Sequence, residues 1–332
     1  MGEGQGERGV FGRLKTWYVF TRPFTLLPPA IGMISGGITG WGAAGSDVAD
    51  AYWTRIIPVS ASGVFITVNI ILGALMAAFL NAASNGINQV YDLEVDRINK
   101  PKRMIPAGLM TLREALWVSY ALYAVALLFA LAVNLQCFII AAIAAVLTLV
   151  YSVPPFRTKR WGWAANLTIA VPRGLLLKVC GWATAKSIWH GESWYIGSIF
   201  ALFLLGASTT KDFADMKGDE AGGCQTLPIK YGVRKAAYII SPFFVLPFLL
   251  MPIGANLSWL SGGRWENVLT GNPVLLTVFG LVLAAWGMYV NYLIMRRPEE
   301  LATTENHISW THMYRMMMTA QLAFIISYVW RW

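Results

Sequence analysis

The stretch Asn88-Gln89-Val90-Tyr91-Asp92-Leu93-Glu94-Val95-Asp96 decides the fold of this chain, because it places acidic residues at the end of a long apolar segment. If the helix of that segment continues through the stretch, Asn88, Asp92 and Asp96 lie four residues apart and share one helix face. This first acidic stretch therefore predicts a cluster of oxygen ligands at the end of an apolar helix.

A second acidic stretch, Lys211-Asp212-Phe213-Ala214-Asp215-Met216-Lys217-Gly218-Asp219, follows another apolar segment and puts Asp212 and Asp215 one helical turn apart. Mg²⁺ prefers oxygen ligands, keeps several waters and is usually shared with substrate phosphates. Two such clusters facing each other predict a diphosphate held through metal. On the pattern alone, a transporter that binds a divalent ion and a pair of merely solvated loops stay open.

The composition indicates a membrane protein with several spans. Of the 332 residues, 56% are hydrophobic and 13% are charged, which is too apolar for an ordinary soluble domain. We expect no cleavable signal peptide, because the N-terminus is rich in glycine and charge. The net charge of +9 is spread over short loops without a basic face, so nucleic acid is not an expected partner. The three cysteines lack metal-ligand spacing and are too few for a disulfide framework, so we interpret them as packing residues.

Apolar segments of about 20 residues predict an all-α fold with nine transmembrane helices around a central cavity. Residues 1–20 form a separate N-terminal interfacial segment in this interpretation, and residues 21–332 form one intramembrane domain. The predicted spans are 24–44, 57–80, 114–133, 136–153, 164–184, 194–210, 237–256, 273–295 and 313–330. Arg173 and Lys178 fall inside the fifth span, where a charge is costly and is expected to face a polar cavity or reach an edge.

The distribution of lysine and arginine among the loops predicts the orientation of the protein in the membrane. Alternate loops and the N-terminus hold 20 of the 26 basic residues, whereas the opposite loops and the C-terminus hold only Arg55, Lys186, Arg264 and Arg331. The N-terminus and both acidic stretches, expected as Asp-rich loops, should therefore be cytoplasmic.

Several motifs together resemble the UbiA superfamily of intramembrane prenyltransferases. The pattern Asn88-x3-Asp92-x3-Asp96 with Asn99-x-Pro101-x-Arg103 resembles the first signature of that family, and Asp212-x2-Asp215-x2-Gly218-Asp219 resembles the second. Tyr151-Ser152-x-Pro154-Pro155 with Lys159-Arg160 resembles the loop after span four, and Arg22-Pro23 resembles the start of span one. Different parts are similar to homogentisate prenyltransferases, chlorophyll synthases and archaeal lipid-forming members.

The resemblance implies Mg²⁺-dependent transfer of a prenyl group from an isoprenoid diphosphate to a lipid-soluble acceptor, with diphosphate released. It implies that Asn88, Asp92 and Asp96 hold one metal and that Asp212, Asp215 and Asp219 hold the other, with Asp92 and Asp215 as direct ligands. Asp96 and Asp219 could instead orient waters or loop cations.

Cations on the same side are expected to bind the diphosphate oxygens that the metals leave free. The expected substrate-binding residues are Arg22, Arg103, Tyr151, Lys159, Lys211 and Arg173. An aromatic or macrocyclic acceptor is preferred, with a glyceryl-phosphate lipid or an internal cyclisation of the prenyl cation as alternatives.

Overall fold

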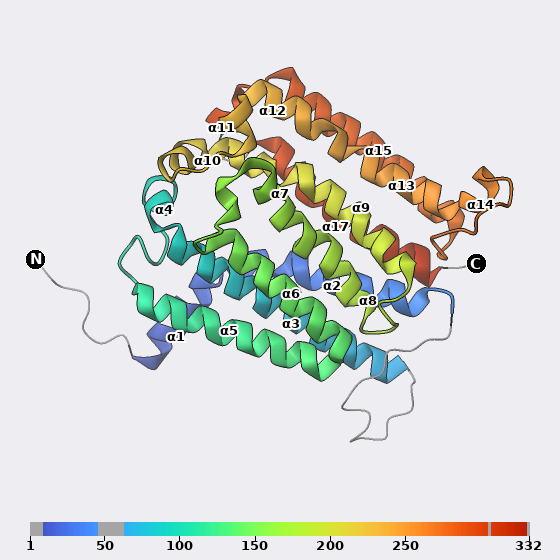
Figure 1. The fold of residues 1–332 in the computed structure, drawn as a ribbon, viewed down its shortest axis with the longest axis horizontal. Coiled ribbons are helices and arrows are strands. Elements are labelled where there is room, and N and C mark those ends of the chain that lie inside the picture. Colours follow the sequence, from blue (N-terminus) through green and yellow to red (C-terminus); the bar gives the residue numbers. More distant parts are fainter. Residues whose placement is uncertain (1–8, 46–62, 305–306, 331–332) are drawn as a thin grey trace, which may run out of the picture.

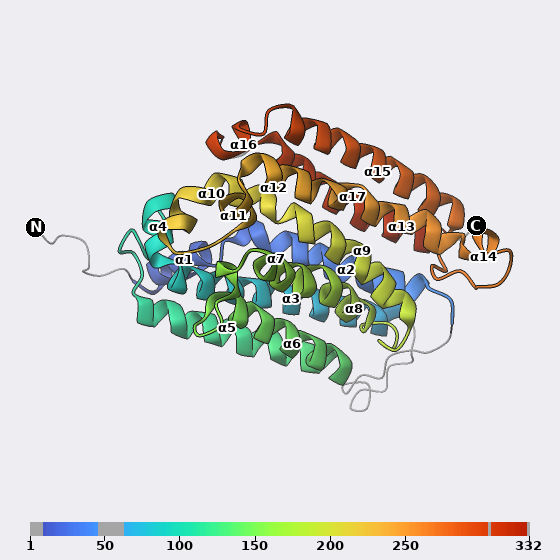
Figure 2. The same cartoon turned by 45° about the horizontal axis from the view of Figure 1, so that its top comes forward.

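The computed structural model describes residues 9–45, 63–304 and 307–330, and over these ranges the chain is helical without β-strands. Its long helices run side by side in one bundle (Figures 1 and 2). The all-α prediction is confirmed. The first eight residues, Arg55 and Arg331, which entered the charge count, lie outside the described ranges, as does the predicted start of span two at 57–62.

Within the described ranges, six helices are long and apolar enough to cross a membrane. The chain is therefore an integral multi-pass membrane protein. The six are α3 (Gly63–Tyr91), α5 (Leu112–Val133), α6 (Leu135–Ser152), α9 (Gly191–Ala207) continued by α10 (Thr209–Ala221), α12 (Val233–Ile240) continued by η5 (Ser241–Phe244) and α13 (Leu246–Ala255), and α15 (Pro273–Arg296).

Three further predicted spans are helical but do not reach that length or apolarity as single helices, so the count of nine stays a prediction. They correspond to α2 (Leu27–Gly42), to α17 (Ile308–Val329), and to the consecutive pieces α7 (Gly162–Ala170), η4 (Val171–Leu176) and α8 (Leu177–Trp182). The last of these spans is interrupted because η4 is a π-helix with Pro172 near its start, and proline has no N–H to donate to the preceding turn.

Short elements complete the described chain. They are α1 (Val10–Phe20), η1 (Pro23–Leu26), α4 (Leu93–Asn99), η3 (Thr158–Arg160), α11 (Leu227–Tyr231), α14 (Leu257–Leu260) and α16 (Glu300–Thr303). Helix α1 lies where the interfacial segment 1–20 is expected, although its treatment as a separate segment stays a prediction. Spans three and four form a tight helical hairpin, because Asn134 alone joins α5 to α6 and its side chain accepts a hydrogen bond from the Cys137 N–H.

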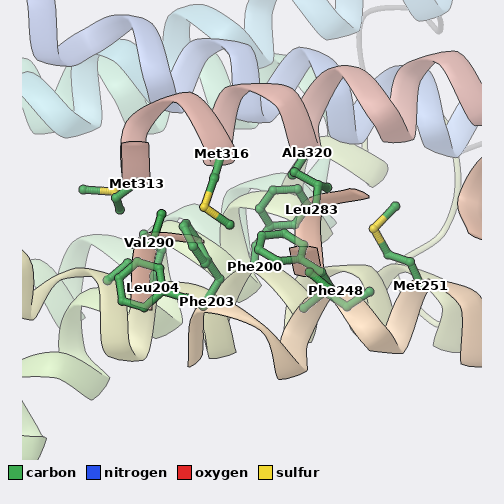
Figure 3. Close-up of a cluster of buried hydrophobic side chains, with 14 of the residues drawn as sticks. Phe200, Phe203, Leu204, Phe248, Met251, Leu283, Val290, Met313, Met316 and Ala320 are labelled. Carbon is green, nitrogen blue, oxygen red and sulfur yellow. The ribbon is translucent and has the colours of Figure 1, made fainter. Parts of the chain in front are cut away.

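One half of the bundle packs around aromatic and methionine side chains. Figure 3 shows this cluster, to which α9 contributes Phe200 and Phe203, α13 contributes Phe248, and α17 contributes Met316. The Phe203 and Phe248 rings have centroids 5.2 Å apart, within the range of favourable aromatic pairs. This tightly filled half gives the second acidic stretch, which continues from α9, a rigid support.

The other half of the bundle brings α2 against α8 at glycine contacts. A Cβ on Gly36 would lie 2.9 Å from the Gly181 Cα, and a Cβ on Gly181 would lie 2.7 Å from the Met33 carbonyl oxygen. Since real Cβ atoms do not approach so closely, only glycine fits on both sides. Small residues at such contacts let membrane helices pack backbone to backbone.

Lys178 of α8 is buried in the same region, so the charge expected at a cavity or an edge is instead enclosed by helices. Its ammonium donates hydrogen bonds to Ser35 Oγ (2.9 Å), to the Gly32 carbonyl oxygen (3.3 Å) and to Gln321 Oε1. The three acceptors come from α2 and α17, so Lys178 fastens α8 to both helices.

Candidate active site

The first acidic stretch does not continue as one helix. Helix α3 ends at Tyr91, Asp92 has φ −101° and ψ 16°, and α4 begins at Leu93. Helix-like hydrogen bonds nevertheless cross the break, because the Asp92 N–H donates to the Asn88 carbonyl (2.9 Å) and the Asp96 N–H donates to the Asp92 carbonyl (2.7 Å). Asn88, Asp92 and Asp96 therefore remain near one another, as predicted, and Asn88 Nδ2 donates to Asp92 Oδ2 at 2.7 Å.

Basic side chains surround Asp92. Lys159 Nζ lies 2.6 Å from Asp92 Oδ2, and an Arg157 guanidinium nitrogen lies 3.2 Å from Oδ1. Burial alone lowers the pKa of Lys159, but the carboxylates of Asp92 and Asp219 outweigh that effect and raise it above the ordinary value. Lys159 is therefore a fixed cation at the centre of the site.

Asp96 is held in the same way by Arg103. One guanidinium nitrogen of Arg103 donates to both carboxylate oxygens of Asp96, at 2.6 and 2.5 Å. Burial raises the pKa of Asp96, although the Arg103 guanidinium opposes that shift. This contact fits the prediction that Asp96 orients a loop cation, and its part in metal binding stays a prediction.

The second acidic stretch lies within α10, so it is helical where a loop was expected. Lys100 Nζ lies 2.8 Å from Asp215 Oδ2, and Lys159 Nζ lies 3.9 Å from Asp219 Oδ1. The Asp212 carboxylate makes no hydrogen bond or ion pair with any described residue, while Asp215 and Asp219 are near enough to act on it electrostatically. Asp212 is thus an acid in an acidic environment, where the more distant Lys159 opposes the negative charge of Asp215 and Asp219 without pairing with Asp212.

Helices α4 and α10 bring the two stretches together at one end of the bundle (Figure 1). Asn99 Nδ2 donates to the Asp215 carbonyl (3.1 Å), and the Gly218 N–H donates to Asn99 Oδ1 (3.1 Å). A Cβ on Gly218 would lie 2.3 Å from Asn99 Nδ2, so glycine is needed there. Lys159 also touches Asp92 and Asp219, one acid from each stretch. The predicted meeting of the two clusters is therefore present.

The donor set of the site fits a hard cation. Among the described residues no group of three or more histidine, cysteine or acidic side chains is already arranged to hold a metal ion. Lysine or arginine contacts a carboxylate oxygen of Asp92, Asp96, Asp215 and Asp219. The available ligands are carboxylate and amide oxygens, which suit Mg²⁺. The unpartnered carboxylate of Asp212 is the observation that best fits such an ion.

Arg22 lies between α1 and η1 in a left-handed backbone conformation (φ 57°). Burial, together with the nearby cations Arg103 and Arg173, lowers its pKa to about 10. Neither Arg22 nor Arg173 makes an ion pair within the described part of the chain. Arg22 is half-buried, whereas Arg173 is exposed. Because burying an unpaired cation is costly, it is Arg22 in particular that favours an anionic ligand.

A largely apolar cavity inside the bundle includes Arg173. Its polar lining residues Asn81, Ser84, Thr148 and Arg173 lie toward the acidic end, whereas Met76, Ile140 and Cys180 lie toward the opposite end. Asn88 follows Ser84 by one helical turn on α3. The cavity thus runs along the helices into the apolar interior, and its polar end lies about one helical turn from Asn88.

Two other predicted substrate-binding residues are less directly placed. Tyr151 is near the end of α6, within electrostatic range of Asp92, Asp212 and Asp219. Lys211 is in α10, but its Nζ lies over the Trp310 ring, 5.9 Å from the centroid, and forms no ion pair with a described acid. The roles of both remain predictions.

Sequence reasoning assigned no site role to Arg157, Lys100 or Asn99. Arg157 donates to the Tyr91 carbonyl (3.0 Å) as well as to Asp92, and it shares with Arg22 a positive φ (35°). In the sequence, Arg157 and Lys100 are indistinguishable from the basic residues that set membrane orientation. Only the folded loops reveal which of these cations point at the acids.

The helical bundle brings together two acidic stretches, basic side chains between them and an apolar cavity behind them. This arrangement is typical of intramembrane enzymes that act on substrates with an anionic group and an apolar chain. The chain belongs to the UbiA prenyltransferase family, whose model matches residues 51–305, and it is accordingly a membrane prenyltransferase. The transporter alternative is thereby set aside.

Relatives in other organisms agree with this assignment. The chain is 32% identical over 232 residues, 69% of its own length and 70% of the relative's, to the bacteriochlorophyll synthase 34 kDa chain of Chloroflexus aurantiacus. It is 30% identical over 260 residues, 78% of its length and 85% of the relative's, to the digeranylgeranylglyceryl phosphate synthase of Thermococcus gammatolerans. The similarity to both a chlorophyll-type and a lipid-forming enzyme matches the mixed resemblance of the motifs.

Solved structures share the fold. A structure from work on digeranylgeranylglyceryl phosphate synthase in membranes aligns with a TM-score of 0.64 and 25% identity over 95% of this chain and 98% of that chain. A UbiA homologue from Archaeoglobus fulgidus bound to GPP and Mg²⁺ aligns with a TM-score of 0.61 and 20% identity over 93% and 99% of the two chains.

Proposed function

We propose that this protein transfers a prenyl group from an isoprenoid diphosphate to a lipid-soluble acceptor in a reaction that requires Mg²⁺, at the site where the two acidic stretches meet. The observation that carries the proposal is the contact of α4 with α10, with Lys159 between Asp92 and Asp219. Support for the metal comes from the oxygen donor set and from the Mg²⁺ and GPP bound by the Archaeoglobus fulgidus homologue.

Bound Mg²⁺ would neutralise the charge that develops on the leaving diphosphate as the C–O bond breaks. Asp92 and Asp215 would hold the metal ions, as would Asp212, whose carboxylate has no partner to release. Lys159 and Lys100 now pair with those acids, and on substrate binding we expect their ammonium groups to turn to phosphate oxygens. Arg22 and Arg103 would complete the cradle by charge-assisted hydrogen bonds.

The cavity behind the acids suits the prenyl chain. Its apolar lining solvates an isoprenoid tail and keeps water from the allylic cation, which water would convert to an alcohol. Ser84, Thr148 and Arg173 lie at the end where tail and diphosphate would join. Tyr151, near the same end, is the aromatic residue that we expect to face the cation.

An aromatic or macrocyclic acceptor is our first expectation, supported by the similarity to the bacteriochlorophyll synthase chain. A glyceryl-phosphate lipid is the second candidate, supported by the digeranylgeranylglyceryl phosphate synthases among the relatives and the solved structures. The uncompensated Arg22 and Arg173 are compatible with an acidic group on either kind of acceptor.

The deciding experiment gives the purified protein radiolabelled geranylgeranyl diphosphate and a panel of phenolic acids, naphthoates, chlorophyllides and glyceryl-phosphate lipids. We expect diphosphate release and a labelled product with one acceptor class, and loss of both when EDTA removes the metal and their return when Mg²⁺ is added. Absence of Mg²⁺-dependent diphosphate release with every donor length and acceptor would refute the proposal. A labelled cyclic hydrocarbon formed without acceptor would instead identify a cyclase.

A further inference from the structure

Two cysteines that the prenyl-transfer site does not use meet inside the bundle. Cys137 Sγ, in the first turn of α6, lies 3.1 Å from Cys180 Sγ, in α8. A disulfide bond is 2.03–2.05 Å long, so the sulfur atoms need to approach by only about 1 Å. The sequence could not show this pair, because 43 residues separate the two cysteines.

Hydrogen bonds that do not involve the thiols already join the start of α6, near Cys137, to the segment that follows α8, near Cys180. Asn134 Nδ2 donates to the Ala183 carbonyl (2.7 Å), and the Ile188 N–H donates to Gln136 Oε1 (2.9 Å). These bonds join the turn before α6 to the connection after α8. The sulfur atoms are therefore held in proximity by contacts that do not depend on the thiols.

The apolar cavity reaches one member of this pair. Cys180 lines the cavity beside Ile140 and Leu176, at the end away from the acidic site. An isolated buried thiol is inert because polar oxidants do not reach it. An apolar reagent inside the cavity would instead meet the Cys180 thiol, which is in contact with the Cys137 thiol.

We propose that Cys137 and Cys180 are a redox-active dithiol that a membrane-soluble quinone oxidises to a disulfide. The Sγ–Sγ bond forms as both S–H bonds break, and the two protons and two electrons pass to the quinone, which leaves as the hydroquinone. The product ties α6 to α8 at the inner end of the cavity. A dithiol reductant reverses the reaction by thiol–disulfide exchange.

The test counts free thiols by intact mass after N-ethylmaleimide labelling in denaturing detergent. Purified full-length protein is first treated with duroquinone, whose fully substituted ring leaves no position for thiol addition. The chain has three cysteines, so the untreated protein should gain three labels and the quinone-treated protein only one, on Cys224. Dithiothreitol should restore all three.

Matched variants identify the pair. Cys224→Ser should carry two labels before oxidation and none after it, whereas Cys180→Ser should carry two under both conditions, as should Cys137→Ser. Three labels on the quinone-treated wild-type protein, or a disulfide peptide that contains Cys224, would overturn the proposal. Equally fast oxidation by oxidised glutathione, which is too polar for the cavity, would overturn the route through it.

Discussion

The two acidic stretches differ in how their charges are balanced. Asp92 and Asp96, at the end of α3 and in α4, are both held by cations at hydrogen-bonding distance, from Lys159, Arg157 and Arg103. In α10, Asp215 has Lys100, Asp219 has only the 3.9 Å contact to Lys159, and Asp212 makes no hydrogen bond or ion pair with a described cation, although Lys159 acts on it from a longer distance. The first stretch is close to neutral, and the second is left with negative charge.

This difference indicates a division of labour between the stretches. Since a divalent cation gains most where negative charge is uncompensated, we expect Asp212 of α10 to bind metal without first releasing a partner. The first stretch must release its lysine and arginine partners before its carboxylates can do so. The released cations are then available to the incoming diphosphate, so metal and substrate binding should be coupled there.

The largest expected effect concerns both stretches acting on one step. Asp92→Asn and Asp215→Asn should each lower turnover by a factor on the order of 10² or more, comparable to losing one transition-state contact. Because the two act as a unit, the double variant should be far less than multiplicatively worse. Steady-state diphosphate release measures the effect, and Glu220→Gln, an exposed acid of the same helix, is the control. Full activity in folded Asp215→Asn would remove the second stretch from the mechanism.

A smaller effect separates the balanced stretch from the unbalanced one. Asp96→Asn leaves the largely buried Arg103 without its acceptor and should destabilise the metal-free protein by about 1 kcal/mol, the lower end for an unsatisfied buried donor, because the fold already disfavours the charge of Asp96. Asp212→Asn removes an unpartnered charge, so its melting temperature should stay the same or rise while half-maximal activity requires more Mg²⁺. Thermal unfolding in detergent and Mg²⁺ titration distinguish the two. The opposite order of melting temperatures would contradict the assigned difference in charge balance.

A third prediction tests whether the unpaired cation Arg22 destabilises the empty site and binds the diphosphate. Its pKa is lowered to about 10, so the protonated form is disfavoured by folding and costs stability at all pH values below that point. Arg22→Gln should therefore raise the melting temperature of the ligand-free protein by a few degrees and weaken binding of Mg²⁺-diphosphate roughly tenfold, as expected for one charge-assisted contact. Arg13→Gln, an exposed arginine of α1, should change neither quantity. A lower melting temperature for Arg22→Gln would show that Arg22 stabilises the empty site.

The smallest expected effect comes from cysteine substitutions that test the membrane orientation, which should leave activity nearly unchanged. The distribution of lysine and arginine predicts that both stretches face the cytoplasm. Cysteines placed at Glu94 and Lys217, one exposed position in each stretch, should react with a membrane-impermeant maleimide only after the cell membrane is opened, whereas a cysteine at Arg264 should react in intact cells. Labelling of both stretches in intact cells would reverse the predicted orientation. Labelling of only one would place the two stretches on opposite sides of the membrane.

The sequence could predict the helical class, the membrane location and the two acid clusters because each depends on local patterns. Apolar length identifies a span, and acids at helical spacing identify a shared face. The break at Asp92 was not predictable from spacing, since the hydrogen bonds on either side remain helical and only the dihedral angles of Asp92 depart.

Two partners of the acids could not be predicted for a different reason. Lys100 and Arg157 lie in basic loops where most charges set orientation, and only tertiary contacts select those that turn inward. Similarly, Lys178 is placed by Ser35 and Gln321, residues 143 positions away on either side. The contact of Cys137 with Cys180 is equally non-local, so spacing rules for cysteine could not identify it.

The glycine contact between α2 and α8 also constrains when the protein can become complete during its synthesis. Gly36 and Gly181 are 145 residues apart, which the ribosome covers in roughly 7 to 30 s at 5–20 residues per second. Throughout that interval the glycine face of α2 has no α8 to pack against, and a larger partner in its place would block the later approach. Helix α2 must therefore wait without its partner α8, and a ribosome stalled before α8 would leave an unfinished bundle with that glycine face uncovered.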